Sequence, residues 1–133
     1  MRFSTRTTYG LRAMIRLAQN SSKGSVSLPS IAKVEGISLG YLERLFAKLK
    51  KAGLIKAVIG ASGGYKLGQP PSRITIFEIV KVLEGEMSLF HCINEKGKIY
   101  CDKKCICGVP LVLIKVQAAI NKSLKSIKLS ELI

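Results

Sequence analysis

The sequence predicts a mainly α-helical fold with a small β wing: a winged helix-turn-helix domain followed by a long C-terminal helix. Three observations lead to this prediction. Two amphipathic segments are joined by a short turn that contains glycine, which is typical of a helix-turn-helix. A β-branched apolar run, a glycine-rich turn and a short returning strand follow directly, and a long apolar-rich stretch lies near the end of the chain.

The first helix is expected from about residue 4 to residue 20. Ser4 is suited to cap it, because serine at this position commonly bonds the first amides of a helix. Tyr9, Ala13 and Leu17 recur every four residues and form one apolar stripe. A polar turn that ends at Gly24 then closes this element.

The helix-turn-helix is expected at about residues 28–51. Ser27 would cap a short helix that Gly36 ends, and Ser38 would cap a second helix from Leu39 to Ala52. In the short helix, three apolar residues are expected to face inward: Ile31, Ala32 and Val34. The second helix spaces its apolar residues mostly three and four apart, at Leu39, Leu42, Leu45, Phe46 and Leu49.

The opposite face of the second helix is polar. A helix presented in this way fits the DNA major groove, roughly 12 Å wide, with its N-terminal side chains toward the base edges. Its N-terminal amides favour a phosphate. The alternative is an ordinary helical hairpin with a solvated polar face. The residues of this face are Gly40, Tyr41, Glu43, Arg44, Ala47, Lys48 and Lys51.

A β wing is expected at about residues 54–68. Leu54–Ile59 is apolar and β-branched, Gly60–Gly64 is a glycine-rich turn, and Tyr65–Leu67 is a short returning strand. The glycines permit positive φ angles and a close approach to another backbone. A phosphate-binding loop of the nucleotide-binding type is excluded, because no Gly-Lys-Ser/Thr sequence and no helix follow.

The second part of the chain, residues 74–133, is expected to hold two helices around a cysteine-rich loop. Thr75 and Glu78 form a capping box for a helix that ends at Gly85. The loop spans about residues 86–108, and the last helix about residues 109–126. That helix is apolar nearly all round at its start, so it needs a partner surface. A two-fold dimer would supply it; folding back onto its own domain is the alternative.

The charge is uneven along the chain. Residues 1–73 carry 13 Lys and Arg against two Glu, whereas residues 74–133 carry nine against six acidic residues, within a net charge of +14. This balance predicts that residues 1–73 bind a polyanion such as double-stranded DNA. No nucleophile motif, His–carboxylate pairing or nucleotide loop supports an enzyme, and no small-molecule substrate is evident.

The location expected for this protein is the cytoplasm. No apolar run approaches the length of a membrane span, and the N-terminus lacks the apolar stretch of a signal peptide. Cysteines stay reduced in that compartment, which favours metal binding over disulfides.

All four cysteines fall between residues 92 and 107, spaced C-x8-C-x3-C-x-C. Three interpretations are open. An iron–sulfur cluster needs three or four thiolates around a loop. Structural zinc would use four thiolates, or three thiolates and His91, although C-x-C is a poor chelate for one tetrahedral ion. A metal-free thiol switch is the third, because Lys103 and Lys104 beside Cys105 favour a reactive thiolate.

Several motifs resemble the IscR/NsrR family of bacterial winged-helix transcription regulators. They are Tyr9–Met14, Ile37–Phe46, Lys51–Leu54, Gly60–Tyr65 and Ile127–Leu132. The resemblance covers almost the whole chain. It implies a homodimer that binds palindromic operators and that senses iron–sulfur, redox or nitric oxide status. Some members of this family carry a cluster on three loop cysteines, and some carry none.

The resemblance also implies a ligand set. The family's cluster cysteines are spaced C-x5-C-x5-C, with a histidine three residues after the last. Cys101 and Cys107 reproduce the second interval, and Cys92 takes the first position after a longer interval. These three are the expected ligands of a [2Fe-2S] cluster, with [4Fe-4S], zinc or no metal as alternatives. Cys105 is an extra thiol that could substitute for one of them. Pro110 stands where the family has histidine, so the fourth ligand is open: Cys105, His91, Glu95, Asp102 or a residue of a partner chain could supply it.

For DNA, the geometry and the resemblance together indicate two groups of residues. In the wing, Ile59 stands where the family often has arginine, so reading of the minor groove is expected to be weaker unless Lys56 or Lys66 contributes. Glu43 would select sites by accepting from cytosine rather than add affinity; the alternative is a solvated carboxylate near Arg44 or Lys48. The candidate DNA-binding residues are Ser38, Leu39, Gly40, Tyr41, Glu43, Arg44 and Lys48 in the helix, and Gly60, Gly63 and Gly64 in the wing.

Overall fold

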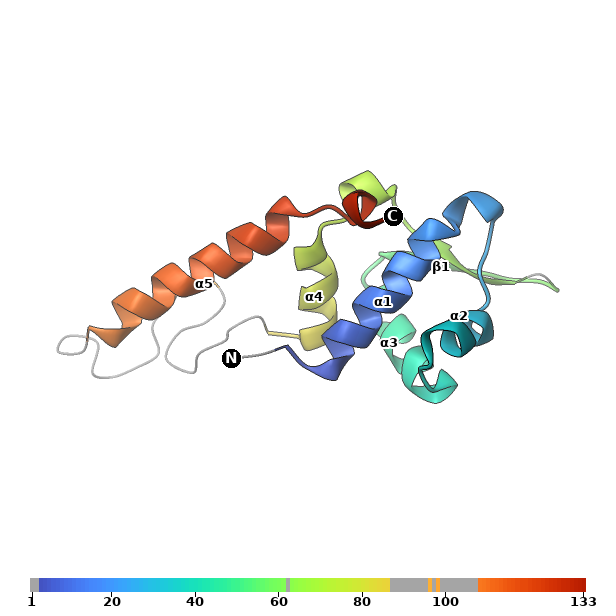
Figure 1. Ribbon diagram of the computed structural model, residues 1–133, viewed down its shortest axis with the longest axis horizontal. Helices are drawn as coiled ribbons and strands as arrows, with labels where there is room; N and C mark the ends of the chain where they lie inside the picture. Colours follow the sequence, from blue (N-terminus) through green and yellow to red (C-terminus); the bar gives the residue numbers. More distant parts are fainter. Residues whose placement is uncertain (1–2, 62, 87–95, 97, 99–107) are drawn as a thin grey trace.

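The fold is a bundle of helices with a two-stranded wing, as a computed structural model shows for residues 3–61, 63–86, 96, 98 and 108–133 (Figure 1). This confirms the predicted winged helix-turn-helix followed by a long helix. The elements in chain order are α1 (Thr5–Gln19), η1 (Ser21–Lys23), α2 (Leu28–Glu35), α3 (Leu39–Lys51), β1 (Ile55–Val58), β2 (Gly64–Leu67), η2 (Pro71–Arg73), α4 (Ile76–Glu84), α5 (Val109–Ser126) and η3 (Leu129–Leu132).

Three of the four predicted helix caps form the expected hydrogen bonds. The hydroxyl oxygens of Ser27 and Ser38 accept from the backbone N–H groups three residues on, both at 3.3 Å. Thr75 and Glu78 form the full capping box of α4. Ser4 occupies the N-cap position of α1 but makes no side-chain cap, because its hydroxyl donates to Glu84 instead.

The turn between α2 and α3 depends on Gly36. This residue has a φ of +66°, in the left-handed region, where a side chain would be strained. The turn lets the Ile37 N–H donate to the Ala32 carbonyl at 3.0 Å, which closes the end of α2. The short, hydrogen-bonded turn fixes the angle at which α3 leaves α2.

Helices α1 to α4 share a hydrophobic core. Its largest fully buried side chains include Phe46, Met14, Leu42 and Leu83. Leu129 from η3 is also fully buried there, so the segment that follows α5 packs into the core that α1 to α4 share. Four residues of α4 are buried in this core: Ile76, Ile79, Val80 and Leu83.

The prediction that Val34 faces inward is wrong. Its side chain is 62% exposed. Helical positions turn by about 100° per residue, which directs Val34 away from the face that Leu28, Ile31 and Ala32 bury. Leu39, at the first position of α3, is also 39% exposed, so the apolar stripe of α3 begins at Leu42.

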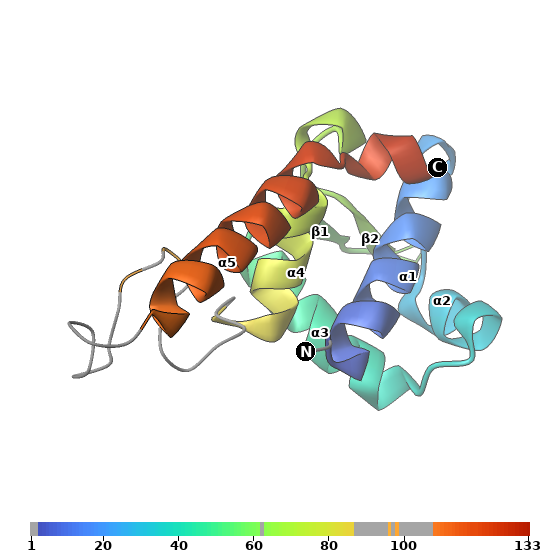
Figure 2. The same cartoon turned by 60° about the vertical axis from the view of Figure 1, so that its left-hand side comes forward.

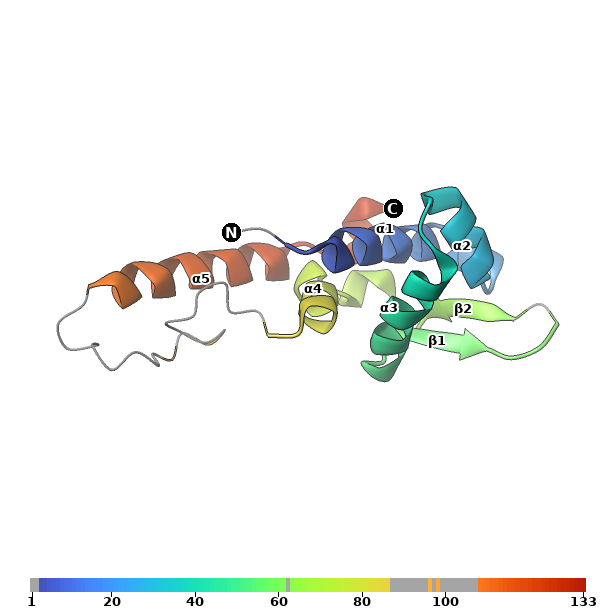
Figure 3. The same cartoon turned by 90° about the horizontal axis from the view of Figure 1, so that it is seen from below.

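The wing is an antiparallel hairpin in which Ile55 pairs with Leu67 and Val58 pairs with Gly64. A third segment joins it, because Val26 and Tyr65 exchange two backbone hydrogen bonds of 2.8 Å. The Tyr65 ring meets the Phe46 ring of α3 edge to face, with centroids 5.1 Å apart. These contacts fix the base of the wing beside α3, and Figure 3 shows the hairpin projecting past that helix.

Helix α5 extends away from the remainder of the molecule, at the end opposite the wing (Figures 1 and 2). Near its start Val109, Leu111 and Val112 are between 52% and 67% exposed. After α5 the chain returns to the domain, where the Ile76 N–H donates to Ile127 and the Leu129 N–H donates to Ile74. The helix is therefore anchored at its C-terminal end and presents an apolar surface at its other end.

Within the part of the chain that the structure describes, no helix combines the length and the apolar character that crossing a membrane requires.

Candidate nucleic-acid interface

The candidate interface is built on the outer face of α3. Leu42, Leu45, Phe46 and Leu49 are buried on the inner face, and this burial fixes the rotation of the helix about its axis. The predicted contact residues of α3 consequently reach the surface: Ser38, Leu39, Gly40, Glu43, Arg44 and Lys48 are exposed, and Tyr41 is half-buried. All seven residues of α3 and its cap are therefore at least partly exposed.

The first turn of α3 is held in place by α1. The rings of Tyr41 and Tyr9 meet edge to face, with centroids 5.9 Å apart. A guanidinium lies over each ring: Arg12 is 5.8 Å from the Tyr9 centroid and Arg44 is 5.6 Å from the Tyr41 centroid. Tyr41 therefore both reaches the surface and locks α3 against α1, a contact that helical periodicity alone could not reveal.

At Gly40 no side chain covers the backbone at the start of α3. A Cβ added there would meet nothing within 4 Å, so no packing contact requires glycine at this position. The backbone of the first turn is consequently accessible to a large partner. The amides of a helix N-terminus attract phosphate, and this one carries no acidic residue in its first turn.

The exposed face of the wing carries two lysines. Lys56 of β1 lies directly opposite Lys66 of β2, and both side chains are exposed. Two like charges at directly opposed positions destabilise a hairpin. A phosphate placed between them would remove that cost, so this pair suits a polyanion better than it suits the isolated fold.

The three candidate glycines of the wing have different structural roles. Gly60 has a φ of +129°, which a side chain would strain, and next to it Ile59 is 98% exposed. A Cβ at Gly63 would run into the carbonyl oxygens of Val58 and Gly60, and one at Gly64 into the backbone of Val26. The fold therefore requires glycine at Gly63 and Gly64 whether or not they also contact DNA.

Two arginines of α1 serve the fold. Arg12 and Arg16 donate to the two carboxylate oxygens of Glu35 in α2, at 3.0 and 2.9 Å. Arg12 also donates to the Glu35 carbonyl oxygen at 2.6 Å. These contacts tie α2 to α1.

Glu84, the last residue of α4, holds the end of α4 to the start of α1. The sequence did not predict this role. The Glu84 carboxylate accepts from the Ser4 N–H at 2.8 Å, from the Ser4 hydroxyl at 2.6 Å and from the Thr7 hydroxyl. Burial alone would raise the pKa of Glu84, but these hydrogen bonds and the nearby Arg6 guanidinium lower the pKa below its ordinary value. No local sequence signal links positions that are 80 residues apart.

The predicted metal ligands Cys92, Cys101, Cys105 and Cys107, together with His91, lie outside the described residues. Among the residues that are described, no group of three or more His, Cys, Asp or Glu side chains could hold a metal ion. The structure places the two ends of the cysteine segment: it leaves α4 after Glu84 and enters α5 at Val109.

Comparison with known proteins gives one family and several related structures. The family model Rrf2, described as an iron-dependent transcriptional regulator, matches residues 3–133. The HTH-type transcriptional regulator CymR of Bacillus subtilis (strain 168) is 44% identical over 96 residues, covering 72% of this chain and 70% of CymR.

Two solved structures are similar over nearly the whole chain. IscR of T. potens has a TM-score of 0.79 and 42% identity, covering 98% of this chain and 84% of that one. CymR, described as the global cysteine regulator of B. subtilis, has a TM-score of 0.82 and 36% identity, covering 99% and 95%. These likenesses confirm the resemblance to IscR-type regulators that the sequence motifs indicated.

Proposed function

This chain belongs to the Rrf2 family of DNA-binding transcription regulators, and from that premise we propose that it acts as a homodimer on palindromic operators under the control of a cysteine-ligated iron–sulfur cluster. The family is one of regulators and not of enzymes. The observation that carries the proposal is the outer face of α3, whose exposed polar residues stand beside a wing with two opposed lysines.

The DNA contacts divide by chemistry. Arg44, Lys48, Lys56 and Lys66 are exposed cations suited to phosphates, which give affinity without sequence information. Glu43 repels phosphate but accepts from the cytosine amino group, so it selects among sites. Ser38, Leu39, Gly40 and Tyr41 form the N-terminal turn that enters the major groove, and Gly60, Gly63 and Gly64 shape the wing beside it.

The homodimer is supported by α5. Its first turns expose Val109, Leu111 and Val112, and such apolar surface is unfavourable in water unless a partner covers it. A second copy with the same exposed helix gives a two-fold interface, in which the same patch serves both subunits. Two-fold symmetry would present two α3 helices to the two halves of a palindromic site.

The cluster proposal rests on donor chemistry. Thiolates are the ligands that iron–sulfur clusters prefer, and the segment between α4 and α5 supplies four. Cys92, Cys101 and Cys107 would hold a [2Fe-2S] cluster, and Cys105 would complete the ligand set or substitute in it, because Pro110 offers no side-chain ligand. Ligation would order the segment and shift the start of α5, changing the spacing of the two α3 helices.

A second candidate is a thiol-redox regulator of the same fold without a cluster, or with zinc. The 44% identity to CymR, described as a global cysteine regulator, favours it. In that case the reactive group would be a thiolate, and Cys105 beside Lys103 and Lys104 is the proposed one.

The test is analysis of anaerobically purified protein for iron, sulfide and zinc, with a visible spectrum. The same measurements are made on Cys92→Ala, Cys101→Ala, Cys105→Ala and Cys107→Ala. The cluster proposal requires that the wild-type protein absorbs visible light. It also requires that the Cys92→Ala, Cys101→Ala and Cys107→Ala variants lose this absorption. A colourless protein, with or without zinc, supports the second candidate.

Operator binding is tested separately. Fluorescence anisotropy with palindromic DNA is measured at several salt concentrations, before and after removal of the cluster. A steep fall of affinity with salt is expected from phosphate contacts. If the loaded and cluster-free proteins bind every operator with equal affinity, the cluster does not control binding.

A further inference from the structure

The tip of the wing carries an isoleucine that the fold leaves in water. Ile59 is 98% exposed, whereas the other exposed large hydrophobic residues that the structure describes are between 39% and 67% exposed. Single apolar residues are common at protein surfaces, so exposure alone indicates no function. The place of Ile59 in the wing, and the way the backbone holds it there, decide what this side chain can contact.

The backbone on both sides of Ile59 is fixed by hydrogen bonds. Val58, the last residue of β1, pairs with Gly64 of β2. Directly after Ile59, the carbonyl oxygen of Gly60 accepts from the Gly63 N–H at 3.0 Å, which closes the tip of the hairpin. Ile59 therefore lies between the end of a paired strand and a closed turn, and its position follows from that of the wing.

The tip of the wing is also slender. Three of the five residues that follow Ile59 are glycines, so little side-chain volume surrounds the isoleucine. At Gly63 the fold itself excludes a larger residue, because a Cβ would run into the carbonyl oxygens of Val58 and Gly60. The minor groove of DNA is roughly 6 Å wide. A hairpin tip of this composition fits a space of that width, whereas a tip with larger side chains would not.

Ile59 belongs to the side of the wing that α3 covers. Side chains of a strand alternate between two faces. Ala57 pairs with Tyr65, whose ring packs on Phe46 of α3, and Ile59 follows Ala57 by two residues. By this alternation Ile59 continues the α3 side of the hairpin, at the end that projects past the helix (Figure 3).

The two wing lysines set the depth to which the tip could enter a groove. Three residues separate Lys56 from Ile59, which is about 10 Å at about 3.3 Å per residue of strand. The minor groove is roughly 7.5 Å deep. When Ile59 lies in the groove, Lys56 and the opposed Lys66 consequently lie at the height of the phosphates on its rim.

We propose that Ile59 enters the minor groove of bound DNA and packs against its sugars and its floor. This inference rests on the proposed function and adds a residue that selects sites. Burial of the side chain would add affinity without releasing counterions. The guanine amino group lies in the minor groove, and an apolar side chain would leave that donor without a partner. Ile59 would therefore favour A·T over G·C pairs beneath the wing.

The test uses the full chain and a palindromic duplex selected from a randomised pool by binding to the wild-type protein. Fluorescence anisotropy gives the affinity at several salt concentrations. Ile59→Ala is expected to weaken binding by about five- to tenfold, with an unchanged slope of log affinity against log salt. Ile59→Arg is expected to steepen that slope by about one, because it adds a cation at the groove.

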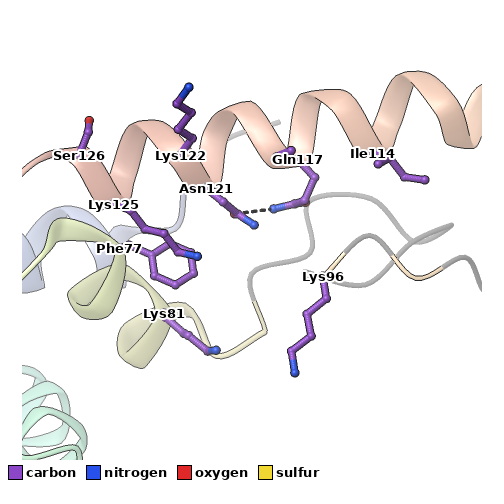
Figure 4. A pocket seen from close by; sticks show the side chains of 10 residues that line it. Phe77, Lys81, Lys96, Ile114, Gln117, Asn121, Lys122, Lys125 and Ser126 are labelled. Carbon is purple, nitrogen blue, oxygen red and sulfur yellow. Dashed lines mark hydrogen bonds between the residues drawn. The ribbon is translucent and has the colours of Figure 1, made fainter.

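Two control variants match these changes away from the wing. Ile133→Ala removes another exposed isoleucine, which lies directly after η3. Ser126→Arg adds the same charge at an exposed position in the last turn of α5 (Figure 4). Both controls are expected to keep the affinity and the salt slope of the wild type. Because Ile59 is 98% exposed, its variants are expected to melt at the wild-type temperature, which circular dichroism checks.

Modified duplexes identify the groove. Replacing adenine by 2,6-diaminopurine adds an amino group in the minor groove and keeps the donor and acceptor pattern of adenine in the major groove. The replacement is made at one base pair at a time. Wild-type affinity is expected to fall when the added amino group lies beneath the wing, and Ile59→Ala is expected to be less sensitive at the same pair.

The outcomes separate this contact from the proposed function. A wild type that binds the selected duplex, with an Ile59→Ala variant of equal affinity, overturns the Ile59 contact and leaves the regulator proposal standing. The contact is also overturned if Ile133→Ala weakens binding as much, if Ile59→Arg keeps the wild-type salt slope, or if diaminopurine affects wild type and Ile59→Ala equally at every pair. A wild type that binds no duplex of the pool overturns both proposals.

Discussion

The carboxylate of Glu84 accepts hydrogen bonds from both the backbone N–H and the hydroxyl of Ser4, at 2.8 and 2.6 Å. Glu84 ends α4 and Ser4 precedes α1, so this contact joins the start of the cysteine segment to the first helix of the domain. Helix α1 in turn contacts α3 through Tyr9 and Tyr41. A displacement at the end of α4 would therefore reach α3, the helix that we propose contacts DNA, through direct contacts.

Replacing Glu84 should destabilise the protein. We expect Glu84→Ala to lower the free energy of unfolding by about 2 to 3 kcal/mol, because a carboxylate that accepts several hydrogen bonds in a mostly buried position is removed. The Arg6 contact adds little, since its side chain is 46% exposed. Urea denaturation measures the loss, and Glu86→Ala, two residues on and exposed, is the control expected to change nothing. Equal stability of the two variants would mean that the Glu84 contacts are not made in solution.

The same carboxylate should make stability depend on pH. The pKa of Glu84 is lowered in the folded state relative to its ordinary value of 4.5. A group with a lowered folded pKa contributes its stability in full above the unfolded value, and the contribution is lost as pH falls through the folded pKa. The stability difference between wild type and Glu84→Gln should thus be constant above about pH 5.5 and shrink as the pH falls below 4.5. A difference that persists unchanged at pH 3 would contradict this assignment.

The opposed lysines of the wing should affect stability and DNA binding in opposite directions. In Lys56→Ala/Lys66→Ala we expect unfolding stability to stay equal or rise by a few tenths of a kcal/mol, because a like-charge pair is removed. Operator affinity should fall, and the slope of log affinity against log salt should become shallower by about one per lost phosphate contact. Anisotropy titrations at four salt concentrations measure both quantities. Lys115→Ala on α5 is the control, and an unchanged salt slope in the double variant would exclude the wing lysines as phosphate contacts.

Local signals explain why much of the fold was predictable. The capping box of Thr75 and Glu78 defines the start of α4, and the predicted range of 109–126 for the last helix matches α5. The contacts that the sequence did not reveal join residues far apart in the chain. Glu84 meets Ser4 across 80 positions, and Arg12 meets Glu35 across 23. Composition and periodicity contain no information on such pairs, because the two contacts depend on how the helices pack against one another.

In the candidate nucleic-acid interface, too, some features were predictable from the sequence and others depended on tertiary contacts. The exposed residues of α3 followed from helical periodicity, because one buried face fixes the other. The structural role of Gly64 did not follow, since it depends on Val26, a residue on a segment that precedes α2. The cysteine ligand set lies outside the described residues and stays a prediction.

Gly64→Ala should destabilise the wing. A Cβ at this position would collide with the Val26 carbonyl and approach the Ser27 nitrogen within 2.9 Å, and both are backbone atoms that cannot turn aside. Separating them breaks the two hydrogen bonds between Val26 and Tyr65. We expect a loss of about 2 kcal/mol of unfolding free energy, in the range of overpacked sites. Thermal unfolding checks it, and a melting temperature equal to that of wild type would show that the Val26 segment can move away.

Gly40→Ala is the converse substitution. A Cβ at Gly40 would meet nothing within 4 Å, and alanine is the better helix former, so the unfolding free energy should rise by up to about 1 kcal/mol. Operator affinity should nonetheless fall, because a methyl group would stand on the bare N-terminal turn that we propose approaches the duplex. Denaturation and anisotropy on the same preparation measure the two effects. A variant that is more stable and binds DNA as tightly as wild type would show that the duplex does not approach Gly40, whereas opposite signs would place that turn against the DNA.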